Sequence, residues 1–490
     1  MADSLKEKTI SGILWSSVGR FGTMMINFLS NLVLARLLMP DDFGCIAMLY
    51  VFIAVSGIFV NGGLGSALVQ KKTPTHLDYT TVFYWNLVVS ALFYLLLFFT
   101  APAISRFYAM PVLTPVLRVQ SLSLLINAFA IVQATQLQKQ LRFKELSVRN
   151  LIAATIGTAV GIVMAFCDFG VWSLVASALV SALSSVLLLW KMSSWRPSLS
   201  FSFSTLRALF SFGGLMLLSN LVETIYINLQ RLIIGKMFSA SDLGYYNQAK
   251  KLEEVPTTTL STIINEVSFP VFSQLQDDHE MLVSALRKNI KAVTYVNFPL
   301  MLLLIVIAHP VITLLYSVKW EASVPYFQVL CLYGFFYTLN TLNTNIIKSL
   351  GKGLLFFFLQ LTKRLLGIGM IVVGVKWGGI MGMLWSIALF GVLCYIINAI
   401  VVGKLIHYGL LRQFRDWLPC LLVTAAASVS AWLCGYGCMV NEYLMMVLQI
   451  AAFTLIYLGL SYLFKLEAFT TYREIVISKW NRFRNRQNQS

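Results

Sequence analysis

Apolar stretches follow one another through nearly the whole chain, and they limit its fold more than any other feature. A helix needs about 20 mostly apolar residues to cross the hydrocarbon core of a bilayer. Hydrophobic residues make up 58% of the 490 residues and charged residues only 12%, which is too little charge for the surface of a soluble protein. The sequence therefore predicts an all-α integral membrane protein. We expect fourteen transmembrane helices, at about residues 11–36, 43–66, 81–104, 114–137, 147–167, 171–190, 206–235, 252–275, 292–316, 324–347, 354–375, 379–402, 416–436 and 443–464.

The junction between the first two predicted helices recurs 200 positions further along the chain. Residues 35–44 read ARLLMPDDFG and residues 235–244 read GKMFSASDLG, so a cation, two large apolar residues and an Asp-(Phe or Leu)-Gly turn coincide without a gap. Asp41 or Asp42 is suited to capping the helix that follows. Transporters are often built from duplicated helical units of this kind.

The repeat predicts a domain organisation. We expect two repeat-related six-helix bundles, at residues 1–190 and 206–403, joined by a cytoplasmic linker at 191–205. The last two helices, within 404–464, have no counterpart in the first half. The tail at 465–490 mixes aromatic and basic residues, which is typical of an interfacial helix lying on anionic lipid.

The formal net charge of +17 does not indicate nucleic-acid binding, because most of the 37 Lys and Arg residues fall in loops on one side of the predicted membrane. By the positive-inside rule that side is cytoplasmic, and the even number of spans places both termini there. Four cations remain within the predicted spans: Arg20, Arg231, Lys363 and Arg364.

Polar side chains recur at helical spacing along the first predicted helix and again along the seventh. The first helix carries Arg20, Thr23, Asn27 and Asn31, and the equivalent positions of the seventh carry Asn220, Glu223 and Arg231, with Ile227 as the apolar exception. A polar stripe on a spanning helix must face a bundle interior or a water-filled cavity. The two stripes therefore predict a polar lumen.

The motifs resemble those of a known family. The matching segments are 34–44 (LARLLMPDDFG), 61–70 (NGGLGSALVQ), 170–174, 195–197, 234–236, 243–246, 269–270 and 319–320. They are similar to the polysaccharide transporter family of Wzx-type flippases, in the multidrug/oligosaccharidyl-lipid/polysaccharide superfamily, and most to its colanic and teichuronic acid exporter branch. The resemblance covers about residues 5–400.

This resemblance implies a MATE-like fold and a function. The implied activity is alternating-access translocation of an undecaprenyl-diphosphate-linked oligosaccharide across the bacterial inner membrane, for O-antigen, capsule or exopolysaccharide synthesis. A polysaccharide polymerase and glycosyltransferases would be its partners, membrane lipid its surroundings, and a single chain the transport unit. No cofactor is implied, apart from a proton or sodium gradient. The four His residues lie far apart in the sequence, which disfavours a metal site.

An anionic cargo gives the intramembrane charges a role. We expect Arg20 and at least one of Lys363 and Arg364 to hold the diphosphate, with Arg231 nearer the periplasmic exit. Thr23, Asn27, Asn31 and Asn220 would line the cavity. The alternative is that these cations are locked in pairs with Glu223, Glu266 or helix carbonyls. The same two acids are candidates for ion coupling, and a structural ion pair is the competing interpretation.

Two other classes of protein stay open. A cation-coupled multidrug exporter of the same fold would need a compact, aromatic, acid-lined pocket. A membrane polymerase or glycosyltransferase would need a sizeable loop outside the membrane that carries its chemistry, and the predicted loops are short. The sequence therefore favours a transporter that is not an enzyme.

Overall fold

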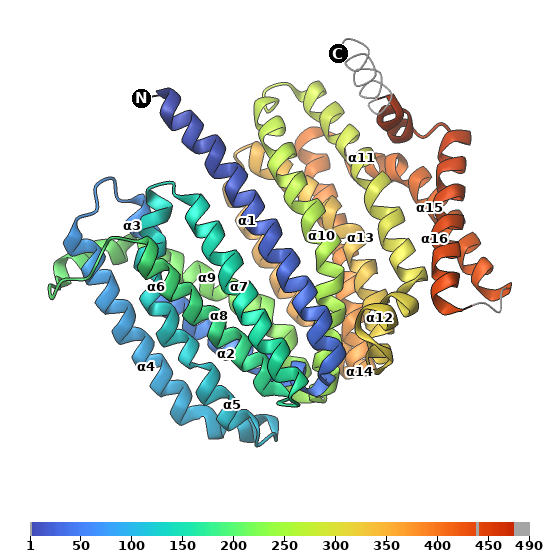
Figure 1. Cartoon of the computed structure of the whole chain (residues 1–490). Coiled ribbons are helices and arrows are strands. Elements are labelled where there is room, and N and C mark those ends of the chain that lie inside the picture. The colour runs from blue at the N-terminus through green and yellow to red at the C-terminus, as the bar shows by residue number, and fades with distance from the viewer. Residues whose placement is uncertain (1, 438–440, 475–490) are drawn as a thin grey trace, which may run out of the picture. The chain divides into compact units, whose positions relative to one another are not determined.

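The computed structural model describes residues 2–437 and 441–474, and these are almost entirely helical (Figure 1). The elements in chain order are α1 (Ala2–Leu37), α2 (Pro40–Asn61), α3 (Leu64–Gln70), α4 (His76–Tyr108), α5 (Leu113–Gln120), α6 (Leu122–Lys139), α7 (Phe143–Phe166), α8 (Val171–Met192), α9 (Phe203–Met237), α10 (Ala240–Gln274), α11 (His279–Val306), α12 (Ala308–Tyr316), the 3-10 helix η1 (Val318–Ser323), α13 (Val324–Ser349), α14 (Gly353–Ile406), α15 (Leu410–Gly437) and α16 (Glu442–Leu463). Residues 467–474 are also helical, and residues 475–490 of the predicted interfacial tail lie outside the described residues.

Eleven helices of the described chain are long and apolar enough to cross a membrane, or twelve if the bent α9 counts as one span. The count of fourteen is not confirmed. One reason is α10, where Lys250, Lys251, Glu253 and Glu254 make the helix polar. The other is α14, which contains the predicted spans 354–375 and 379–402 in one 54-residue helix with non-helical backbone angles at Gly378 and Gly379.

The chain forms two compact units, Met1–Asn247 and Gln248–Ser490, and the boundary falls inside α10. The first unit holds α1 to α9 and the first turns of α10. The irregular segment 193–202 connects α8 to α9 within the predicted linker. The lobe boundaries expected from the repeat stay a prediction.

Small residues set the closest helix contacts of the first unit. Gly157 of α7 approaches the backbone of Ser177 in α8 so closely that an added Cβ would lie 2.6 Å from its carbonyl oxygen. On α1, Gly19 and Gly22 face Ser147 and Leu151 of α7 in the same way. Without a hydrophobic driving force between helices in lipid, such close packing is what favours association.

The two copies of the repeated motif begin their helices with the same cap. The Met39 backbone N–H donates to Asp42 Oδ2 at 3.0 Å, and the Ser239 backbone N–H donates to Asp242 Oδ2 at 3.2 Å. Each acid is the third residue of its helix, where it can satisfy a backbone donor that lacks a helical partner. The predicted capping role is confirmed for Asp42.

The first turns of α2 and α10 cross each other symmetrically, and both turns belong to the first unit. A Cβ on Gly44 would lie 1.8 Å from the Ala240 carbonyl oxygen, and a Cβ on Gly244 would lie 2.1 Å from the Pro40 carbonyl oxygen. The Ser241 hydroxyl donates to Asp41 Oδ1 at 2.7 Å between the same turns. A shift of 200 residues converts each of these positions into its counterpart in the other turn, so the two copies of the motif are related by a local two-fold axis.

In the second unit α16 packs against α15, and α15 packs against α11. Pro299 of α11 cannot donate to the carbonyl four residues earlier, at Tyr295. The Tyr457 hydroxyl of α16 donates to this carbonyl oxygen at 2.8 Å. The proline bend therefore creates the acceptor to which the last helix binds.

We expect Gly44→Ala and Gly244→Ala to destabilise the crossing of α2 and α10, because either methyl group would overlap a backbone carbonyl. Overpacking of this kind typically costs about 1–3 kcal/mol. Thermal unfolding of the purified protein in detergent measures the effect. Gly459→Ala is the matched control, since nothing lies within 4 Å of its added Cβ. Equal melting temperatures for all three variants would contradict the described crossing.

Candidate functional site

A polar cavity of about 720 Å³ lies within the first unit. Helices α2, α3, α6, α7, α8 and α9 contribute to its wall. Its polar lining includes the side chains of Asn61, Asn127, Gln138, Arg149, Asn220 and Glu223.

The turn between α2 and α3 forms part of the wall of this cavity. Gly62 and Gly63 both have positive φ, at 54° and 67°, which turns the chain sharply after α2. A Cβ on Gly63 would lie 2.2 Å from the Gly213 carbonyl oxygen in α9, so only glycine allows this approach. The turn also leaves Asn61 at the end of α2, where its side-chain amide donates to the Gly57 carbonyl at 2.9 Å.

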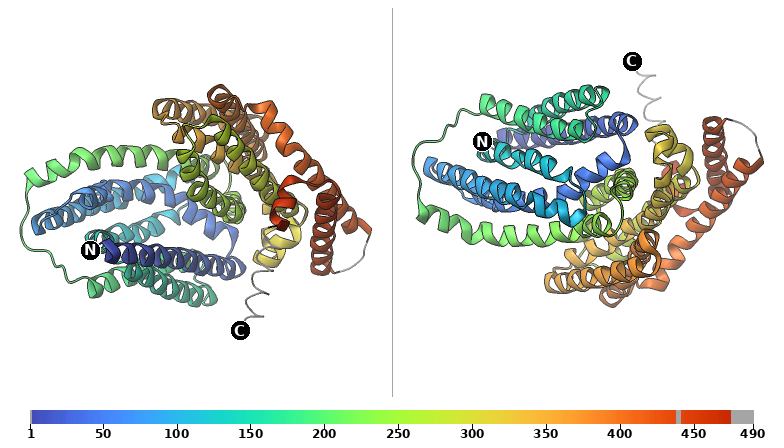
Figure 2. Two further views of the ribbon diagram at one scale, coloured as in Figure 1. Left: turned by 90° about the horizontal axis from the view of Figure 1, so that it is seen from above. Right: turned by 90° about the horizontal axis from the view of Figure 1, so that it is seen from below.

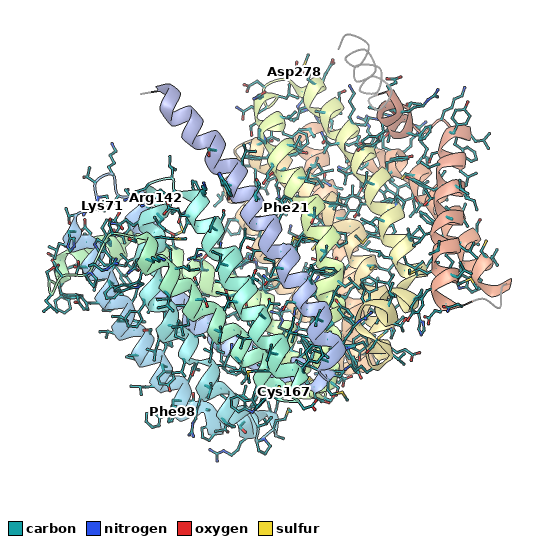
Figure 3. The ribbon with its side chains drawn as sticks, viewed as in Figure 1. Phe21, Lys71, Phe98, Arg142, Cys167 and Asp278 are labelled. Atoms are coloured by element: carbon teal, nitrogen blue, oxygen red, sulfur yellow. The ribbon has the colours of Figure 1, made fainter. Side chains whose placement is uncertain are left out.

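The cavity lies toward one end of the first unit. Figure 3 shows Lys71 and Arg142 at this end and Phe98 and Cys167 at the opposite end. Arg149 stands on the second turn of α7, and its guanidinium donates to Asn150 Oδ1 at 3.0 Å through Nε. Arg149 is thus a cation among amides and hydroxyls.

The predicted α1 stripe does not line this cavity. Asn220 and Glu223 line it, but Arg20, Thr23, Asn27 and Asn31 do not. Arg20 and Asn27 are exposed, whereas Thr23 and Asn31 are half-buried. Helix α1 packs on α7, whereas α9 packs on α2, α3 and α4. Figure 2 shows α1 and α9 on opposite sides of the first unit.

Arg231 is held by neutral groups. Its Nε donates to Asn247 Oδ1 at 3.0 Å and its Nη1 donates to Asn228 Oδ1 at 2.6 Å. The guanidinium also lies over the Tyr50 ring, 5.3 Å from the centroid. These contacts position Arg231 without neutralising it.

Lys363 occupies a comparable environment in the second unit. It is only 8% exposed, and its Nζ donates to Asn398 Oδ1 at 3.2 Å. The Asn398 amide donates in turn to Asn340 Oδ1 at 2.9 Å. In the described part of the chain, no carboxylate lies within ion-pair distance of Lys363. Of the other predicted residues in this unit, Arg364 is half-buried and Glu266 is exposed.

Lys250 and Glu253 of α10 form a buried pair in the second unit. Lys250 Nζ lies 2.8 Å from Glu253 Oε2, and the Thr257 hydroxyl donates to Glu253 Oε1 at 2.7 Å. The Glu253 side chain is fully buried. Lys250 also lies over the Tyr333 ring, 5.1 Å from the centroid. Unlike Lys363, this cation is neutralised by an acid.

Sequence reasoning missed Arg149 and the Lys250–Glu253 pair. Neither Arg149 nor Lys250 is among the four cations that the sequence places within the predicted spans. Arg149 lies six residues after Phe143, where α7 begins, and Lys250 lies ten residues after the start of α10 at Ala240. At about 1.5 Å per residue these side chains start roughly 9 and 15 Å along their helices. Counting the residues from the start of each helix would have identified Arg149 and Lys250 as charges well inside their helices.

The fold and these sites define a helical membrane transporter. The structure is similar to that of the lipid II flippase MurJ in an inward closed conformation, with a TM-score of 0.74 and 15% identity, over 95% of this chain and 100% of that one. It is also similar to an inward-facing MATE multidrug resistance transporter of the MOP superfamily, with a TM-score of 0.58 and 15% identity, over 81% of this chain and 98% of that one.

The family model described as "Polysaccharide biosynthesis protein" matches residues 33–325, and the chain belongs to this family. One relative is the teichuronic acid biosynthesis protein TuaB of Bacillus subtilis, 25% identical over 88% of this chain and 89% of the relative. Another is the lipopolysaccharide biosynthesis protein WzxC of Escherichia coli, 26% identical over 87% of this chain and 88% of the relative. The succinoglycan biosynthesis transport protein ExoT of Rhizobium meliloti is 27% identical over 82% of this chain and 80% of the relative. The family consists of multi-pass transporters of polysaccharide biosynthesis rather than enzymes.

Proposed function

We propose that this protein moves an undecaprenyl-diphosphate-linked oligosaccharide from the cytoplasmic to the periplasmic leaflet of the bacterial inner membrane. The observation that carries the proposal is the cavity of the first unit, where one cation stands among amides and hydroxyls. Its volume of about 720 Å³ accommodates a few sugar rings. Amide side chains exchange hydrogen bonds with sugar hydroxyls and allow release.

The cargo's diphosphate explains the need for cations. Moving a phosphate through hydrocarbon is prohibitive, whereas a polar cavity with a fixed cation replaces lost hydration. We assign this role to Arg149 together with Arg20 and the Lys363–Arg364 pair. Arg231 keeps its predicted place toward the periplasmic exit. The polyprenyl tail can remain in lipid while the headgroup crosses.

Multidrug export is the second candidate. A pocket for cationic drugs would carry aromatic rings and several acids. Among the described residues that line the cavity, no aromatic ring occurs and Glu223 is the single acid. This lining favours a hydroxyl-rich, anionic cargo. The alternating access that we propose would involve two lobes, residues 1–190 and 206–403, related by a pseudo-two-fold axis along the membrane normal.

We expect Arg149→Ala to reduce surface polysaccharide strongly in a strain that depends on this protein for export, because the cavity would lose its fixed cation. The same loss is expected for Arg20→Ala combined with Lys363→Ala and Arg364→Ala. Arg142→Ala is the control, since Arg142 forms an exposed pair with Glu145, and such surface pairs contribute little. Polysaccharide is measured at equal protein level in the membrane. Normal export by Arg149→Ala and by the triple variant would remove the basis of the proposed site.

For the topology we propose fourteen helices with both termini in the cytoplasm. Gln276 precedes α11 and Lys319 follows α12, so one membrane crossing separates them. Reporter fusions near Gln276 should show cytoplasmic activity and fusions near Lys319 periplasmic activity. Detection of both reporters on one side would overturn this arrangement.

For coupling we propose Glu223 and Glu266 as the acids that respond to a proton or sodium gradient. Glu223→Gln and Glu266→Gln should then change the dependence of transport on pH or sodium, because the amide cannot ionise. Glu280→Gln, at an exposed position near the start of α11, is the matched control. Uptake by vesicles at several pH values and sodium concentrations measures this. Profiles identical to those of the unaltered protein would exclude both acids as the coupling site.

A further inference from the structure

A second charged cavity lies in the second unit, where α11 and α15 begin and α16 ends. Its volume is about 310 Å³. Its charged lining consists of Arg287 and Lys291 from α11, Arg415 and Asp416 from α15, and Lys465 and Glu467 after α16. Four cations and two acids leave two positive charges in excess. By the proposed topology this end of the unit is cytoplasmic.

Asp416 organises the cations of this cavity. Its carboxylate accepts from Arg287 Nε at 2.9 Å through Oδ1 and from the Tyr408 hydroxyl at 2.7 Å through Oδ2. Lys291 Nζ lies 3.3 Å from Asp416 Oδ1 and also contacts Glu467. The Asp416 side chain is only 8% exposed. The acids therefore hold Arg287 and Lys291 in place.

The remaining positive charge is available to a ligand. In the described part of the chain, the side chains of Arg415 and Lys465 have no hydrogen-bond or ion-pair partner. Arg287 uses Nε for Asp416, and none of its contacts described here engages the two terminal guanidinium nitrogens. A guanidinium whose two terminal nitrogens are available can donate hydrogen bonds to two phosphate oxygens at once.

The chain that follows α16 forms one wall of the cavity. Lys465 has a positive φ of 50°, which reverses the chain at the end of the helix. The helical residues 467–474 then return to α11, where the Tyr472 ring stacks on Tyr295 with centroids 5.9 Å apart. Tyr295, Pro419 and Phe464 give the cavity an apolar side beside its cations. Tyr462, Leu463 and Phe464 are each more than 60% exposed next to it.

We propose that this cavity binds the phosphate headgroup of an acidic membrane phospholipid, with the acyl chains on the exposed apolar surface at the end of α16. Fixed cations with free donors, an apolar side wall and a position at the end of three membrane helices together match a lipid rather than a soluble anion. The proposal does not depend on the cargo, because its measurement is lipid binding and not transport.

The test is native mass spectrometry of the full-length protein with phosphatidylglycerol or zwitterionic phosphatidylethanolamine. We expect phosphatidylglycerol to bind preferentially, and Arg415→Gln with Lys465→Gln to weaken its binding about tenfold or more, as two surface cations do for anionic lipids. The control is Lys404→Gln with Arg412→Gln, which removes the same charge outside the cavity lining. This control should bind phosphatidylglycerol almost as the unaltered protein does.

Several results would overturn the proposal. One is unchanged binding in the cavity variant, and another is an equal loss in the control. Displacement of phosphatidylglycerol by millimolar inorganic phosphate would instead indicate a soluble-anion site. Displacement by an equimolar polyprenyl diphosphate would assign the cavity to the cargo. If the double variant does not fold, Lys465→Gln alone is the test variant, and we expect it to bind phosphatidylglycerol about fivefold more weakly than the unaltered protein.

Discussion

In hydrocarbon every backbone N–H and C=O group needs a partner inside the protein, and the packing of this chain depends on that constraint. Proline inside a helix frees a carbonyl, and at two of the described prolines, Pro102 and Pro299, a neighbouring helix supplies the missing donor. Pro102 of α4 frees the Phe98 carbonyl, to which Arg118 Nε of α5 donates at 3.2 Å. The Tyr457 hydroxyl does the same for Tyr295 in the second unit. At these two positions the carbonyl that proline frees becomes a contact point for a neighbouring helix.

The local features of the fold were readable from the sequence because neighbours along the chain determine them. The cap formed by Asp42 needs only the three residues before it. Most span positions follow from apolar length alone. The number of spans did not follow from apolar length. The charges in α10 make that helix too polar to count as a span, and α14 joins two predicted spans in one helix. Hydropathy measures the average of a segment, whereas crossing a membrane depends on what covers each polar residue.

The candidate site was predictable only in part, for a related reason. Periodicity groups Asn220 with Glu223 on one face of α9, and both residues line the cavity. It could not reveal which helices complete the wall, so Arg149 of α7 was missed. The stripe on α1 does not line this cavity, because Gly19 and Gly22 bring α1 against α7. A stripe identifies a face of a helix, but the partner of that face depends on contacts distant in sequence.

The charges on the long helices differ in what holds them, and this difference bears on the proposed transport. Glu253 cancels the charge of Lys250, so an anion would gain little from approaching that pair. Lys363 and Arg231 are held instead by amide oxygens, which offset part of the cost of burial but leave the full positive charge. An amide partner can be exchanged for a phosphate oxygen without separating opposite charges. A cation held in this way binds an anion and also releases it, which a transporter requires of every cargo it carries.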